Sequence, residues 1–70
     1  MVITLSHEQV EALEALTERR VVMSRIPSLQ RMGIVVFKQD WELTQKGQRL
    51  VEAIKNGKFK ADAEGMEISL

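Results

Sequence analysis

The chain has few of the residues that stabilise small proteins through disulfides or bound metals. Its 70 residues include no cysteine, one histidine, one proline, one tryptophan and two phenylalanines. Without cysteine there can be no disulfide or thiolate zinc site, and the lone His7 lies beside Glu8 in the first turn of a predicted helix rather than in a metal-ligand pattern. Because a chain of this size buries only about 60% of its unfolded surface, we expect a marginally stable single domain that gains stability as a homodimer.

Net charge and long apolar runs are also missing. Ten acidic and ten basic residues cancel, whereas a DNA-binding domain is normally basic. The charges are unevenly distributed, however, since residues 44–60 carry five cations and one anion between an acidic first helix and an acidic C-terminus. No apolar run approaches the roughly 20 residues of a membrane span, and residues 1–5 lack the basic leader of a signal peptide. We therefore expect a cytoplasmic protein with no membrane partner.

The first helix has a clear start. Ser6 followed by Gln9 is a capping box, and Leu5 with Val10 fits a hydrophobic staple. The helix is predicted to run to about Arg19. Its outer face carries four glutamates, which are either a solvated surface or a surface that meets the basic third helix of a second copy; they are Glu8, Glu11, Glu14 and Glu18.

The next segment is predicted to be extended and then briefly helical. Residues 21–23 are apolar and partly β-branched, and Pro27 disfavours a helical conformation at Ile26. Proline is well tolerated at the start of a helix. A short helix is therefore predicted from Pro27 to Met32, with Gly33 ending it.

A β-hairpin and a third helix follow. Residues 34–37 and 41–43 are strand-like runs around a polar tip. Thr44 is predicted to cap a helix that ends at Asn56 and Gly57. Gly47 lies in its first turn, where glycine costs about 1 kcal/mol relative to alanine. This indicates that another backbone approaches closely there, unless the glycine is merely tolerated.

Residues 58–70 are predicted to be a tail to a domain formed by residues 1–57. Two alternatives are open for this tail. It is flexible, or its alternating residues 66–70 add a short edge strand that pairs with residues 2–5.

One stretch resembles a known family. The stretch begins with an apolar helix end and a glycine, continues with a hairpin and a Leu-Thr-x-x-Gly motif, and closes with an amphipathic helix. The residues that carry this pattern are, in order, Leu29, Met32, Gly33, Ile34, Val35, Leu43, Thr44, Gly47, Leu50, Val51 and Ile54. The pattern resembles the second half of winged-helix proteins, with a wing of the MarR/PadR type, and small phage and prophage proteins built on the same plan. It covers about a third of the chain. The resemblance implies an α+β fold with three helices and a β-hairpin wing. The fold is abridged, because a full winged helix has two helices between the first helix and the wing, and only residues 17–32 lie there.

The resemblance also implies a function and its residues. Winged-helix proteins bind double-stranded DNA and regulate transcription, and the corresponding positions here are on the short helix, the wing tip and the third helix. The candidate DNA-binding residues are Arg25, Ser28, Gln30, Arg31, Lys38, Gln39 and Lys46. Arginine and glutamine suit base edges and lysine suits phosphates; the alternative is a solvated polar face without a ligand.

A second hypothesis is a protein-interaction module that has the winged-helix shape and binds no DNA. It would dimerise or dock on another protein through Phe37 and Trp41, although Trp41 also fits a role in closing the core. The glycines are too scattered for a phosphate loop, and no nucleophile lies near a base. We therefore expect neither enzyme activity nor a cofactor.

Overall fold

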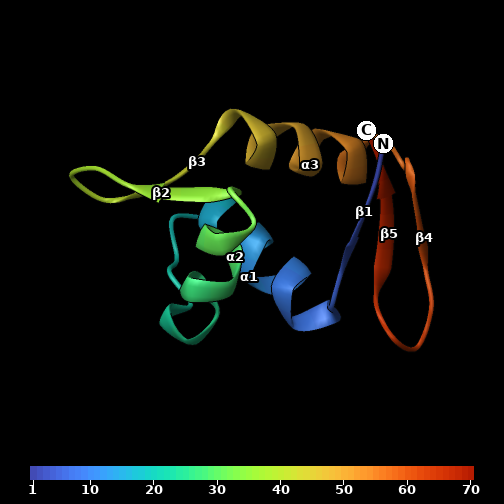
Figure 1. Cartoon of the computed structure of the whole chain (residues 1–70), viewed down its shortest axis with the longest axis horizontal. Coiled ribbons are helices and arrows are strands. Elements are labelled where there is room, and N and C mark those ends of the chain that lie inside the picture. Colours follow the sequence, from blue (N-terminus) through green and yellow to red (C-terminus); the bar gives the residue numbers. More distant parts are fainter.

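Three α-helices and five strands make up the computed structural model, which describes all 70 residues (Figure 1). The elements are β1 Val2–Leu5, α1 His7–Thr17, the 3₁₀-helix η1 Met23–Arg25, α2 Ile26–Arg31, β2 Val35–Phe37, β3 Trp41–Leu43, α3 Gln45–Lys55, β4 Phe59–Ala61 and β5 Met66–Ser69. The predicted α+β class with three helices and a hairpin is confirmed. Two elements, η1 and β4, were not expected.

Helix α1 begins at the predicted capping box. The Gln9 amide donates to Ser6 Oγ at 3.2 Å, and the Ser6 amide donates to Gln9 Oε1 at 2.9 Å. The helix ends at Thr17, two residues before the predicted limit. It ends there because Arg19 adopts a left-handed conformation, with φ of 62°. The Arg20 amide then donates to the Ala15 carbonyl at 2.8 Å, which closes the helix in the manner of a Schellman motif.

The conformation expected before Pro27 is wrong at Ile26. Val22 is extended, as predicted, but Ile26 is helical, with φ of −58° and ψ of −46°. Ile26 is only 2% exposed, and burying an isoleucine contributes about 1.5–3 kcal/mol. This burial outweighs the steric preference of a pre-proline residue for extended backbone. Pro27 lies in the first turn of α2, where its missing N–H is not needed.

Thr44 and Gly47 join the hairpin to α3. The Thr44 amide donates to the Ile34 carbonyl at 2.9 Å. The Thr44 hydroxyl lies 2.5 Å from the Gly33 carbonyl oxygen and accepts the Gly47 amide at 3.2 Å. A Cβ on Gly47 would lie 2.3 Å from the Ile34 carbonyl oxygen. The predicted helix cap and the predicted close backbone approach at Gly47 are both confirmed.

The C-terminal residues form two strands. Strand β5 pairs with β1 in the register Val2↔Ser69 to Leu5↔Met66, as one of the two alternatives for the tail had it. The strand is central rather than at an edge, because β4 pairs with its other side and gives the order β1-β5-β4. Close packing explains this arrangement: Ile68 is fully buried, and Gly65 leaves no room for a Cβ beside the Leu5 carbonyl.

A single core holds these elements together. Its fully buried large side chains come from β1, all three helices, the start of the hairpin and β5; they are Leu5, Leu13, Leu29, Ile34, Leu50 and Ile68. The three-stranded sheet closes one end of the core, while the hairpin β2–β3 extends from the opposite end (Figure 1). None of the helices combines the length and the apolar character needed to cross a bilayer.

Candidate nucleic-acid interface

The candidate side chains lie on η1, α2, the hairpin tip and the first turn of α3, at the hairpin end of the molecule. Helix α2 stands next to β2, and the hairpin extends beyond it, far from the three-stranded sheet (Figure 1). In α2 the core takes Ile26 and Leu29, which are 2% and 0% exposed. Arg31 lies on the opposite side of the helix from these two, whereas Gln30 lies at the border of the buried face; both side chains are exposed. Arg25 is also exposed and ends η1.

The cations of this end are not paired with carboxylates. The one ion pair in the structure joins Arg20 to Glu18 at 3.2 Å, in the loop after α1. Arg31 instead donates from Nε to the Pro27 carbonyl at 3.4 Å within its own helix. Arg25 and Lys38 make no side-chain hydrogen bond. These three positive charges are therefore available to an anionic ligand.

The hairpin tip presents Lys38, Gln39 and Asp40, all exposed. The Lys38 amide donates to the Asp40 carbonyl at 3.0 Å, which closes the turn whose type the sequence left open. The Asp40 carboxylate accepts the Trp41 amide at 2.8 Å. This contact keeps the carboxylate against its own backbone, while Lys38 and Gln39 remain free of side-chain hydrogen bonds.

Two of the seven predicted residues are engaged in the fold. Ser28 Oγ accepts the Gln9 side-chain amide at 2.5 Å, which ties α2 to the first turn of α1. Lys46 Nζ donates to the Met32 carbonyl at 2.8 Å, and so caps the C-terminal end of α2 from the first turn of α3. Both contacts use the polar atom that was predicted to meet DNA. The structure thus leaves five candidates with uncommitted polar groups: Arg25, Gln30, Arg31, Lys38 and Gln39.

The two predicted interface aromatics form a pair on the hairpin. The ring centroids of Phe37 and Trp41 are 5.0 Å apart, with the planes tilted by 58°. Phe37 is 56% exposed, whereas Trp41 is half-buried and packs against the core. Trp41 therefore takes part in closing the core, while its neighbour Phe37 leaves apolar surface in solvent; an interface role for the pair stays a prediction.

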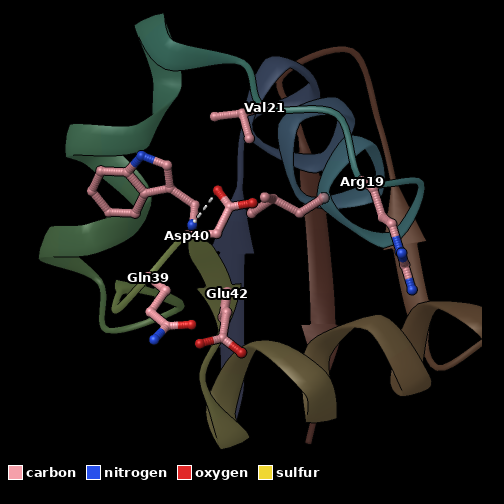
Figure 2. Close-up of a pocket in the computed structure, with 7 residues that line it drawn as sticks. Arg19, Val21, Gln39, Asp40 and Glu42 are labelled. Carbon is pink, nitrogen blue, oxygen red and sulfur yellow. Dashed lines mark hydrogen bonds between the residues drawn. The ribbon is translucent and has the colours of Figure 1, made fainter.

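A shallow cleft of about 370 Å³ lies beside Trp41 (Figure 2). It separates the end of α1 and the loop after it, with Leu16, Arg19 and Val21, from the hairpin residues 39–42. Figure 2 shows that the Arg19 side chain points away from the carboxylates of Asp40 and Glu42. Two acidic residues of the hairpin, Asp40 and Glu42, thus line the cleft.

Sequence reasoning missed one exposed side chain near these elements. Met23 opens η1 and is 61% exposed. Residues 21–23 were predicted to be extended, and nothing local indicates that the chain turns into a 3₁₀-helix at Met23. A methionine thus adds apolar surface close to Arg25, the last residue of the same 3₁₀-helix.

No group of three or more histidine and carboxylate side chains is arranged to hold a metal ion. Comparisons of the chain with protein-family models, with curated proteins and with solved structures found no match. The winged-helix relationship therefore stays a prediction based on residues 29–54.

Proposed function

We propose that the chain is a small DNA-binding module of the winged-helix type that serves in transcription regulation. One observation carries the proposal: η1, α2 and the hairpin tip expose three cations, Arg25, Arg31 and Lys38, and none has a carboxylate within 4 Å. The chain forms one ion pair in all, so its other cations are unpaired as well; these three differ in lying on adjoining elements. A group left unpaired on one helix and the adjoining hairpin is the arrangement that phosphate contacts need.

In this function α2 enters the major groove and the hairpin acts as a wing on the neighbouring backbone. Arg31 suits the O6 and N7 acceptors of guanine, and Gln30 suits the N6 and N7 groups of adenine. Arg25 and Lys38 contact phosphates on either side, and on a duplex of random sequence Arg31 contacts a phosphate as well. Since α2 has only six residues, it spans about 9 Å and reaches few bases, so phosphate contacts supply most of the affinity.

The overall neutrality of the chain is compatible with this function, because eight of the ten acidic groups lie on other elements and only Asp40 and Glu42 lie on the hairpin. Glu8, Glu11 and Glu14 are exposed on α1, and Glu64 and Glu67 are exposed in the C-terminal hairpin. A separation of charge within a neutral molecule gives it a preferred orientation in the field of the DNA. The zero net charge also lowers the non-specific affinity for DNA relative to that of a basic domain.

Salt-dependent binding to a random-sequence duplex tests the proposal. Fluorescence anisotropy should show binding at low salt, with log K falling against log salt at a slope of about −2 to −3 for three phosphate contacts. Arg31→Ala and Lys38→Ala should each reduce the magnitude of the slope by up to about 1. Lys60→Ala is the matched control, because it removes the same charge from β4 at the opposite end of the molecule. An undetectable signal at low salt, or an equal effect of Lys60→Ala, would refute the proposal.

A second candidate function rests on a different observation. Phe37 is 56% exposed while stacked on Trp41, and such an apolar surface suits a protein partner. In this case duplex DNA does not bind at any salt concentration. Phe37→Ser also leaves the melting temperature near wild type, because a side chain held in solvent contributes little to the fold. A large destabilisation by Phe37→Ser would instead assign Phe37 to the core and remove this candidate.

A further inference from the structure

Strand β1 has an open edge whose backbone groups can be assigned. The Leu70 amide donates to the Met1 carbonyl at 2.8 Å. Backbone groups of successive residues alternate between the two sides of an antiparallel strand. Met1, Ile3 and Leu5 therefore direct their backbone groups to β5, and Val2 and Thr4 direct theirs to the side where no strand follows.

This edge carries none of the features that protect edges in monomeric proteins. Lysine, proline, a bulge or an inward charge usually blocks pairing with another chain. Residues 1–5 contain neither a charged side chain nor a proline, and the register of β1 with β5 runs without a bulge. Met1 and Val2 are 80% and 60% exposed, among the largest apolar exposures in the structure.

The opposite edge of the same sheet shows the contrast. Strand β4 contains Lys60 and follows directly on Lys58, and both side chains are exposed. Two copies that paired through β4 would bring these lysines together, and like charges opposite one another destabilise a sheet. Only the β1 edge is compatible with pairing between identical copies.

We infer that the β1 edge is the interface with a second copy of this chain. The two β1 strands pair antiparallel about a two-fold axis at Ile3, so that Val2 of each copy faces Thr4 of the other. Four backbone hydrogen bonds form, two from each Val2–Thr4 pair. The two sheets become one six-stranded sheet with the order β4-β5-β1-β1-β5-β4. The inference is independent of DNA binding.

The geometry selects a second copy because the pairing is self-complementary. The two-fold rotation places Val2 of one copy opposite Thr4 of the other and Thr4 opposite Val2, so both copies use the same surface, as an isologous contact requires. Met1, Ile3 and Leu5 lie on the face of β1 that packs on the core, and Met1 of each copy would meet Leu5 of the other there. The contact thus covers Met1, the most exposed apolar residue, with the core face of the partner sheet.

Sedimentation equilibrium at several protein concentrations tests the inference. The wild-type chain should show a monomer–dimer equilibrium that does not continue to larger species. Thr4→Lys should raise the dissociation constant by at least about tenfold, because it places two lysines close to the axis. The variant keeps its fold, since Thr4 lies opposite Glu67 of β5 and the new charge is attracted there; circular dichroism checks this. Lys60→Thr is the matched control and should leave the equilibrium unchanged.

Cysteine crosslinking tests the register directly, because the chain contains no cysteine. The double variant Val2→Cys/Thr4→Cys should form a covalent dimer on oxidation, since facing Cα atoms in such a pair lie about 5.5 Å apart, within disulfide range. Each single variant should remain monomeric on a non-reducing gel, because like positions lie more than about 7 Å apart. A wild-type chain that is monomeric at every concentration, a dimer that Thr4→Lys leaves intact, or growth into open-ended species would overturn the inference.

Discussion

Replacement of Gly47 by alanine is a strong test of how the hairpin and α3 are joined. In an isolated helix this change stabilises by about 1 kcal/mol, because alanine loses less backbone entropy than glycine. Here the new methyl would lie 2.3 Å from the Ile34 carbonyl oxygen, whereas ordinary van der Waals contact begins near 3.4 Å. The obstacle is backbone, so it cannot rotate away as a side chain would. Either α3 or the start of β2 must move by about 1 Å.

The cost follows from what the Ile34 carbonyl does. It accepts the Thr44 amide at 2.9 Å and lies 3.1 Å from the Thr44 hydroxyl. Moving it weakens both contacts, at about 1 kcal/mol each, and the crowding itself costs about 1–3 kcal/mol. After the helix-propensity gain is subtracted, Gly47→Ala should destabilise the domain by about 2–4 kcal/mol. A chain of 70 residues has a total stability of only about 4–10 kcal/mol.

Urea unfolding followed by the fluorescence of Trp41, the only tryptophan, measures this change. The midpoint should fall and the slope m should stay constant, since the same surface is exposed on unfolding. Gln48→Ala is the control, because Gln48 is the next residue of α3 and is exposed; its effect should stay within about 0.5 kcal/mol. A Gly47→Ala midpoint equal to or above that of wild type would show that the backbones of α3 and β2 are not in contact.

A double-mutant cycle separates the two parts of the destabilisation by Gly47→Ala, which are the weakened contacts with Thr44 and the steric crowding. Thr44→Ala removes the hydroxyl that accepts the Gly47 amide at 3.2 Å and should cost about 1 kcal/mol or more as a lost helix cap. If Gly47→Ala acts by displacing the Ile34 carbonyl from Thr44, the two changes share a cause. The combined variant should then be more stable than the sum of the single effects predicts, by about 0.5 kcal/mol or more. Strict additivity would contradict this mechanism.

Two further predictions concern the core and the end of α1. Leu50→Ala should destabilise by about 2–5 kcal/mol, because Leu50 is fully buried in the core cluster; a thermal melt near wild type would show that α3 buries another face. Arg19→Gly should stabilise by about 0.5–1 kcal/mol, since Arg19 holds a left-handed φ of 62° that glycine adopts without strain. Arg20→Gly, where φ is not positive, is its control and should not stabilise in the same melt.

Much of the local structure could be predicted from the residues alone. The capping box at Ser6, the cap at Thr44 and the glycine stops at Gly33 and Gly57 are short-range patterns, and each produces its effect within one helical turn. Gly33 and Gly57 both have a φ of 74°. These features were predictable because a cap or a left-handed turn depends on neighbouring backbone groups rather than on the rest of the fold.

The errors have long-range causes. Ile26 is helical because its side chain is buried in the core. The pre-proline preference depends only on the adjacent residue and does not include this burial. Strand β4 was missed because Phe59 to Ala61 alternate weakly and are all exposed. It forms because β5 offers an edge, and β5 is itself held in place by β1 from the other end of the chain.

In the candidate site, too, local features could be predicted from the sequence and long-range contacts could not. Helical spacing was enough to predict that Gln30 and Arg31 face solvent, because Leu29 and Met32, three residues apart, were expected on the inward side of the helix. It could not show that Lys46 reaches the Met32 carbonyl, 14 residues earlier in the chain. That contact exists only once the hairpin has folded back and brought the first turn of α3 to the end of α2.

By itself, the sequence determined the helices, the hairpin, the caps and the α+β class, because these depend on period and on short-range hydrogen bonds. Only the tertiary structure decided which polar side chains remain uncommitted and which strand edge stays open. Those properties depend on groups far apart in the chain. Ser28 and Lys46 are engaged by other elements while Arg25, Arg31 and Lys38 are not, and β1 is left at an edge because β5 and β4 extend the sheet on its other side only.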